Sequence, residues 1–181
     1  MPSPPNLQQE GRRAPEEPAG VDPDEPAVGK TVIIGLGNRY LGDDGIGIRV
    51  AEELRQRDLG AGVVVRTHQT FDLWLFSEYS GASGLIIIDA LRSGSPPGTV
   101  TEYIVTPRPD IMTSILGLHS LGLHDLVDFA SRMGLLNCPV IIVGIEPNAC
   151  AVGEGLSPEL EKAVPQVIAR VFGKLGRSTT S

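Results

Sequence analysis

The sequence has few aromatic residues, two cysteines and no long run of apolar residues. Phenylalanine, tryptophan and tyrosine make up 4% of it, so the core must consist mainly of valine, isoleucine, leucine and alanine. Its apolar runs are far shorter than the about 18 residues needed to span a bilayer. Cys138 and Cys150 match neither a CxxC pair nor a zinc-finger spacing. With no secretory signal pattern either, we expect reduced thiols and a cytoplasmic protein.

Positive charge is also scarce, and the common catalytic signatures are missing. A formal net charge of -7 and a pI near 4.9 argue against nucleic acid or an anionic membrane as the main partner. There is no HExxH motif, no GxSxG motif and no recognisable cysteine–histidine signature. The common protease and esterase motifs therefore do not explain this chain.

Composition divides the chain into three parts. Residues 1–29 are rich in proline, glutamate and aspartate and show no apolar period, which predicts a disordered N-terminal arm. Residues 177–181 are polar and predict a flexible tail. Residues 30–176 are long enough for one substantial core, and we expect them to form a single α/β domain.

Apolar periodicity within that part predicts alternating strands and helices. The predicted strands are 31–36, 62–67, 85–89, 99–105 and 139–145. The predicted helices are 44–57, 72–79, 120–133 and a last one that starts at Pro158 after an N-cap at Ser157. Proline at 165 should kink that helix or break a hydrogen bond. The pattern predicts a three-layer α/β/α fold around a twisted, mostly parallel sheet, with the 99–105 strand at an edge or antiparallel.

A glycine-rich loop, GLGNRYLGDDGIGIRVAEEL, joins the first strand to the first helix. A dinucleotide fingerprint needs a third glycine where Tyr40 stands. A phosphate loop from Gly37 to Gly42 would need lysine and serine or threonine where Asp43 and Asp44 stand. Two carboxylates repel a phosphate and suit a metal ion or acid–base chemistry. One should instead cap backbone amides, and Asp43 is our candidate for that structural role.

Further polar residues follow other strands at the edge where such folds bind ligands. Asp89 ends the third predicted strand, His68 follows the second and Glu146 follows the fifth. His119 and His124 lie after the fourth. Taken singly, Asp89 could simply terminate its strand, His119 could cap or pack, and His124 could be a solvated helix position.

Taken together, these residues suggest a metal-contacting set. Two carboxylates and an imidazole from separate elements form a mixed oxygen and nitrogen ligand set. Such a set suits zinc, nickel, manganese or iron and leaves positions open for substrate or water.

Four segments resemble the hydrogenase maturation endopeptidase family. The glycine-rich loop resembles its first motif, IIIDALRSGSPPGTV its second, HSLGLHDLVDFA its third and GIEPNACAVGEGLSPELEKAV its closing segment. The segments follow in the same order and cover almost all of residues 30–175. The chain departs from many members after the second strand, where it has Thr67-His68-Gln69 instead of a glycine-containing turn.

The resemblance implies a phosphorylase/hydrolase-like sheet of about five strands and a specific activity. Such enzymes remove a short C-terminal extension from the large subunit of [NiFe]-hydrogenase after nickel has been inserted. The family's nickel-sensing residues correspond to Asp44, Asp89 and His119, as both metal contacts and catalytic residues. The nickel then arrives with the substrate precursor, and we expect no tightly bound cofactor and a monomeric enzyme.

Two alternatives stay open at this point. The chain could be a metallohydrolase with its own zinc and a different substrate, which metal analysis of the purified protein would reveal. It could also be a non-enzymatic nickel-delivery or nucleotide-binding protein of the same fold class. Asp43 and Asp44 already count against a nucleotide.

Overall fold

The computed structural model describes residues 26–105, 122–153 and 155–176 and contains one sheet of five strands in the order β2-β1-β3-β5-β4. The strands are β1 (Thr31–Leu36), β2 (Val63–His68), β3 (Gly84–Ala90), β4 (Val100–Val105) and β5 (Val140–Ile145). All pair in parallel except β4, which runs antiparallel to β5 at one edge. The predicted sheet and the predicted character of its fourth strand are confirmed.

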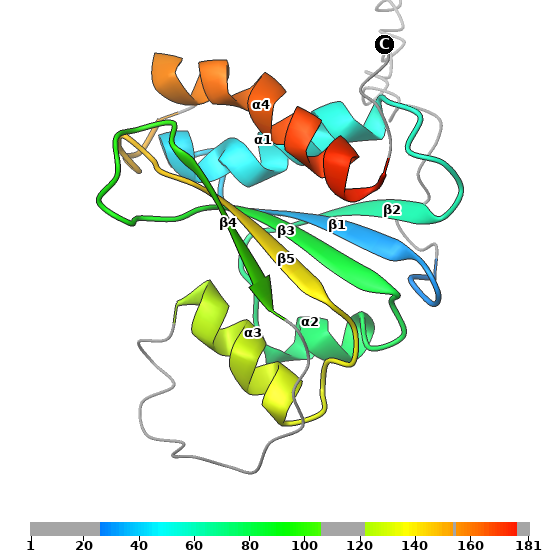
Figure 1. Ribbon diagram of the computed structural model, residues 1–181. Coiled ribbons are helices and arrows are strands. Elements are labelled where there is room, and N and C mark those ends of the chain that lie inside the picture. The colour runs from blue at the N-terminus through cyan, green and yellow to red at the C-terminus, as the bar shows by residue number, and fades with distance from the viewer. Residues whose placement is uncertain (1–25, 106–121, 154, 177–181) are drawn as a thin grey trace, which may run out of the picture.

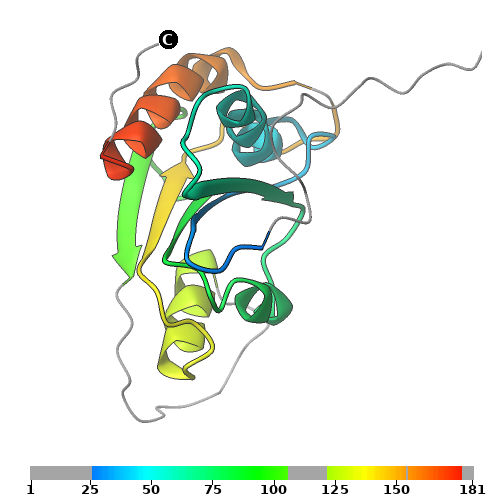
Figure 2. The ribbon, with the colours of Figure 1, turned by 90° about the vertical axis from the view of Figure 1, so that its right-hand side faces the viewer.

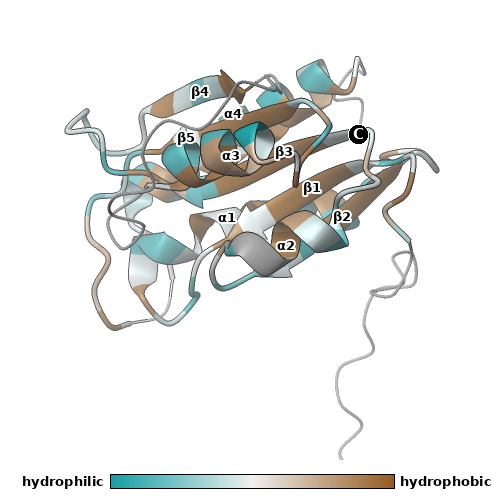
Figure 3. Cartoon of the chain, turned by 90° about the horizontal axis from the view of Figure 1, so that it is seen from below, coloured by the Kyte–Doolittle hydropathy of each residue, from teal (hydrophilic) through white to brown (hydrophobic). Residues whose placement is uncertain are grey.

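Helices cover both faces of this sheet (Figures 1 and 2). The helices are the 3-10 turn η1 (Gly42–Gly45), α1 (Ile46–Arg55), α2 (Leu73–Glu78), α3 (Leu123–Arg132) and α4 (Pro158–Lys174). Helices α1 and α4 pack on one face, and α2 and α3 pack on the other, which Figure 3 shows from below. The three-layer α/β/α prediction is therefore confirmed.

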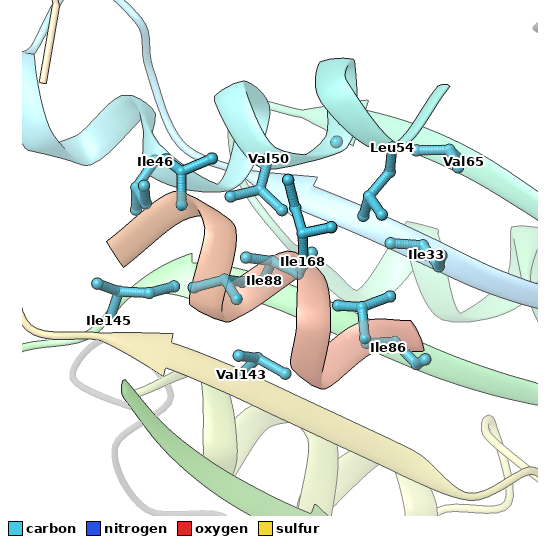
Figure 4. Packing of buried hydrophobic residues seen from close by; sticks show 14 of the residues in the cluster. Ile33, Ile46, Val50, Leu54, Val65, Ile86, Ile88, Val143, Ile145 and Ile168 are labelled. Atoms are coloured by element: carbon cyan, nitrogen blue, oxygen red, sulfur yellow. The ribbon is translucent and has the colours of Figure 1, made fainter. Parts of the chain in front are cut away.

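Successive side chains of a strand point to opposite faces of the sheet, and so each face has its own apolar core. On β1, Ile33 joins the core under α1 and α4, whereas Ile34 joins the core under α2 and α3. Both side chains are fully buried. Figure 4 shows the first of these cores, where Ile168 of α4 lies among residues of β3 and α1. Each such aliphatic side chain contributes about 1.5–3 kcal/mol through burial.

Glycine at 47 lets α1 pack directly on the carboxyl ends of the central strands. A methyl group added at this position would overlap the carbonyl oxygens of Ile88 and Leu36. Only a residue without a side chain allows this close approach of helix and strands. The approach sets the position of the first helix, and with it that of the acidic loop before it.

The structure shifts several predicted element boundaries. Asp44 lies in the 3-10 turn η1 and not in the α-helix, which starts two residues later. His68 is the last residue of β2 and does not follow it. Ser157 is the N-cap of α4, as predicted, and the helix continues past Pro165, whose side chain is exposed. Because proline has no amide hydrogen, one helical hydrogen bond is missing there, as the sequence indicated.

Some predictions fall outside the described residues. These are most of the N-terminal arm 1–29, the tail 177–181 and the start of the predicted helix at 120. Within the ranges that the structure describes, no helix is long and apolar enough to cross a membrane.

Candidate functional site

A cavity of about 270 Å³ lies at the carboxyl ends of β1, β2 and β3, on the side of the sheet covered by α2 and α3. It is lined by Leu36, Gly37, Asp44, Gln69, Thr70, Phe71, Asp89, Ala90, Leu123 and Leu126. Two of the predicted site residues, Asp44 and Asp89, are the only ionisable side chains among the described residues of this lining. The structure therefore brings together two carboxyl groups from separate elements.

Asp44 is held in place by the turn that follows β1. Gly37 has a φ of 122°, in the region that favours glycine, and a side chain there would overlap the Asp44 carbonyl oxygen. The turn brings the Asn38 amide to 2.8 Å from Asp44 Oδ2, to which it donates a hydrogen bond. The Gly37 amide donates to the His68 carbonyl oxygen at 3.2 Å and ties the turn to β2.

Asp89 reaches the cavity through the alternation of β3. Ile86 and Ile88 face α1 and α4, whereas Leu85 and Ile87 face α2 and α3. Asp89 continues the second row and so faces the cavity. Burial raises the pKa of this carboxyl to about 7, the Ala90 amide opposes the rise, and the negative charge of Asp44 adds to it. The group is consequently poised between its neutral and charged forms near neutral pH.

Asp43, the other acid of the loop, has the structural role that the sequence suggested. Its side chain is 2% exposed and accepts hydrogen bonds from three main-chain amides, those of Asn148 at 2.8 Å, Ala149 at 3.1 Å and Ser157 at 2.6 Å. Burial alone would raise the pKa of Asp43, but these hydrogen bonds outweigh it and lower the pKa below its usual value. Asp43 thus fastens the acidic loop to the β5–α4 connection.

Glu146 also has a structural role. Its carboxylate accepts hydrogen bonds from the Ser93 hydroxyl at 2.7 Å, the Ser93 amide at 2.6 Å and the Gly94 amide at 3.3 Å. The hydrogen bonds from Ser93 lower the pKa of Glu146. The residue holds the loop between β3 and β4 and does not line the cavity that contains Asp44 and Asp89.

The three histidines differ in what the structure says about them. His68 Nε2 lies 2.7 Å from the hydroxyl of buried Tyr79, and burial lowers the pKa of its ring. His68 is not among the residues that line the cavity. His124 is an exposed position of α3 beside Asp125 and makes an edge contact with Tyr103. His119 lies outside the described residues, three positions before the N-cap Gly122 of α3.

The cavity also has an apolar wall that the sequence pattern does not predict. Phe71 packs edge-on against Phe76 of α2, with ring centroids 4.8 Å apart, and forms one side. Leu123 and Leu126 from the first turn of α3 form another. Their spacing of three residues indicates one face of a helix, but only tertiary packing shows that this face meets the two carboxyl groups.

A second cavity, of about 390 Å³, lies at the opposite, amino-terminal edge of the sheet. It is lined by main chain and aliphatic side chains, and Lys174 is the one ionisable residue among them. That lysine already forms an ion pair with Glu102 at 2.6 Å. The part of the chain that the structure describes therefore gives the larger cavity no free group for acid–base or metal chemistry.

The smaller cavity, by contrast, contains carboxyl groups that suit acid–base or metal chemistry. Two carboxyl groups with an apolar wall can bind a cation, and the one with a pKa near 7 can take or give a proton at neutral pH. Among the described residues, which leave out His119, no group of three or more histidine, cysteine, aspartate or glutamate side chains could hold a metal ion.

Comparisons with known proteins identify the family of the chain. The sequence profile described as hydrogenase maturation protease matches residues 48–174. The hydrogenase 2 maturation protease of Escherichia coli is 28% identical over 151 residues, which cover 82% of this chain and 92% of the relative. The HupD hydrogenase expression/formation protein of Rhodobacter capsulatus is 30% identical over 153 residues, or 81% of this chain and 71% of the relative.

Solved structures lead to the same group. The hydrogenase maturating endopeptidase HybD of E. coli superposes with a TM-score of 0.67 at 28% identity, covering 81% of this chain and 92% of that one. A hydrogenase 2 maturation peptidase from a Thaumarchaeota archaeon superposes with a TM-score of 0.65 at 28% identity, covering 81% and 98%. The chain therefore belongs to the hydrogenase maturation protease family and is a hydrolase of the endopeptidase class.

Proposed function

We propose that this endopeptidase removes the C-terminal extension of a [NiFe]-hydrogenase large-subunit precursor after nickel has been inserted. The observation that carries the proposal is the pair Asp44 and Asp89 in one cavity at the carboxyl edge of the sheet. Family membership supports the substrate class, because the matching family and the E. coli relative are both named as hydrogenase maturation proteases.

Asp44, Asp89 and His119 are the residues that we assign to the nickel ion of the substrate. Carboxylate oxygens and imidazole nitrogen are ordinary ligands for such a cation. Asp44 comes from the turn after β1 and Asp89 from the end of β3. His119 is close in sequence to α3, whose first turn lines the same cavity through Leu123 and Leu126.

Nickel in the precursor would act first as a recognition element. An ion already bound to the precursor would neutralise two nearby carboxylates, whose mutual repulsion contributes to the high pKa of Asp89. A precursor without nickel gains none of this attraction. Contact with the ion would also place the adjoining tail peptide against the cavity.

Asp89 is our candidate for the general base. A base must be unprotonated at the working pH. The pKa of this carboxyl is raised to about 7 in the free enzyme, and the positive charge of nickel in a bound precursor would lower it, so that Asp89 would be charged. In its charged form it would accept a proton from the water molecule that attacks the scissile carbonyl. The apolar wall formed by Phe71, Leu123 and Leu126 would limit competing water around it.

We place the reaction in the cytoplasm. Cys138 is buried and Cys150 is exposed, and both are free thiols, which is compatible with a reducing compartment.

Alanine substitutions test the assignment of the three residues. Asp44→Ala, Asp89→Ala and His119→Ala should each yield a folded protein that no longer shortens nickel-loaded precursor, read as the mass of the large subunit. His124→Ala is the matched control, since this exposed histidine lies outside the cavity lining. Normal trimming by the Asp89→Ala and His119→Ala variants would rule the assignment out. Nickel or zinc that copurifies stoichiometrically with the enzyme would favour a metallohydrolase with its own ion.

A further inference from the structure

Two apolar side chains are strongly exposed at the carboxyl edge of the sheet. Tyr40 is 59% exposed and Val152 is 91% exposed. The other large apolar residues with comparable exposure in the described ranges, Val28 and Ile104, lie elsewhere. Val28 precedes the amino end of β1, and Ile104 pairs with Ile141 near the amino end of β5.

Tyr40 lies in a turn and Val152 in a bend, and each directly precedes a residue of an isolated β-bridge. Leu41 and Gly153 form a parallel β-bridge. The Gly42 amide donates to the Gly153 carbonyl oxygen at 2.9 Å, and the Gly153 amide donates to the Tyr40 carbonyl oxygen at 3.0 Å. The bridge therefore brings the turn of Tyr40 and the bend of Val152 next to each other. We call this pair of exposed side chains the Tyr40–Val152 platform.

The Asp43 carboxylate also ties the two segments of the platform together. It belongs to the segment of Tyr40 and accepts amides from Asn148 and Ala149 in the segment of Val152. A side chain presented by a preorganised backbone loses little entropy when a partner covers it. Tyrosine is also among the residues most enriched at protein interfaces.

The platform is continuous with the candidate site. The Tyr40 amide donates to Asn38 Oδ1 at 3.0 Å, and the Asn38 amide donates to Asp44 Oδ2 at 2.8 Å. Gly37 and Asp44, at the two ends of this loop, both line the cavity. A partner that rests on the platform is thus held next to the two carboxyl groups.

We infer that the Tyr40–Val152 platform is the docking surface for the folded body of the precursor. The inference rests on the proposed function and extends it. A cavity of about 270 Å³ has room for only a few residues of a tail. The body that carries the tail would then rest on the surface of the enzyme beside the cavity. In the described ranges, the platform is the exposed apolar part of that surface. The matching partner surface is an apolar patch close to the base of the tail.

Trimming kinetics and direct binding test this surface. The variants are Tyr40→Ser and Val152→Ser, with Val28→Ser and Ile104→Ser as controls at the opposite edge. Loss of an interface anchor should raise KM for nickel-loaded precursor and weaken its Kd, by about tenfold for Tyr40→Ser and about fivefold for Val152→Ser. The value of kcat and the thermal midpoint should stay unchanged. Both controls should remain within about twofold of the wild type.

The outcomes separate this inference from the proposed function. If the wild type trims precursor and the platform variants match it in KM and Kd, the docking surface is wrong and the function stands. If the wild type binds precursor but never trims it, the function is wrong, and weaker binding by the platform variants still supports the surface. A wild type that dimerises through Tyr40 in sedimentation, with precursor binding unchanged in the variants, would assign the platform to a second copy of the chain.

Discussion

Two groups of carboxyl side chains at the same edge of the sheet have opposite properties. Asp43 and Glu146 accept two or more main-chain amides each, and their pKa values are lowered. Asp89 is partly buried beside Asp44, and its pKa is raised to about 7. Burial alone therefore does not decide the charge of such a group. The hydrogen-bond donors around it decide whether its pKa is lowered, so that it stays ionised and holds structure, or raised toward neutrality.

Two adjacent residues show that carboxyl groups with different roles can share one turn. Asp43 and Asp44 share the turn η1, but Asp43 points to the β5–α4 connection and Asp44 lines the cavity. The first supplies stability that fixes the position of the second.

The largest expected effect is on catalysis. Asp89→Asn keeps the shape of the side chain but removes its negative charge, so trimming of nickel-loaded precursor should fall by about 10³-fold. Glu146→Gln, an equally conservative change at the end of the neighbouring strand, should leave kcat within about twofold of the wild type. A mass-spectrometric time course measures both. Comparable losses in the two variants would contradict the proposal that Asp89 is catalytic and Glu146 only structural.

The next largest effect is on stability. Asp43→Ala removes the acceptor of three main-chain amides and should lower the free energy of unfolding by about 3 kcal/mol. Urea denaturation measures the change, and Asp128→Ala on the surface of α3 should cost less than about 1 kcal/mol.

The same group has a defined pH dependence. Since the folded pKa of Asp43 is lowered, its contribution is present above its ordinary value of 3.8 and is lost as the pH falls through the folded pKa. The unfolding free energies of the wild type and Asp43→Ala should therefore converge in strong acid. A constant difference down to low pH would contradict the role of the charged carboxylate.

Asp89 predicts a pH effect of the opposite sign. Its pKa is about 7 when folded and about 3.8 when unfolded, so the unfolded chain loses this proton first as the pH rises. Stability should fall between these two values, by on the order of 2 kcal/mol once its partial exposure is considered. Asp89→Asn should remove this fall. Parallel pH profiles of the two proteins in urea denaturation would mean that the Asp89 carboxyl is not poised near neutrality.

The smallest expected effect concerns His68, which lies outside the cavity lining. Tyr79→Phe removes the hydroxyl that lies 2.7 Å from its Nε2 atom and should cost about 1 kcal/mol of stability. Chemical denaturation gives the change, and Tyr40→Phe, at a hydroxyl on an exposed residue, provides the control. A loss well above 2 kcal/mol would show that the His68–Tyr79 pair supports more than β2 and α2.

Local sequence pattern was enough to predict the architecture. The apolar runs of β1, β3 and β5 indicate strands buried on both faces, and the alternation in β4 indicates the antiparallel edge. Helix boundaries moved by a few residues, because the first acidic turn takes the 3-10 form and because capping depends on contacts with other segments.

The chemical character of each acid could be predicted only in part. The sequence favoured a structural Asp43, but its partners Asn148 and Ser157 are more than a hundred positions away. The raised pKa of Asp89 depends on burial by elements that the linear pattern does not place. The same holds for the wall formed by Phe71 and Leu123, which comes from two segments that meet only in the folded protein.

Intact-mass measurement of the large subunit tests the role of nickel most directly. Purified precursor is incubated with this enzyme after nickel loading and, in parallel, without nickel. Recognition through Asp44, Asp89 and His119 predicts loss of a single C-terminal peptide from the loaded precursor and an unchanged mass for the nickel-free one. Equal trimming of both, or trimming of neither, would contradict nickel-dependent processing by this site.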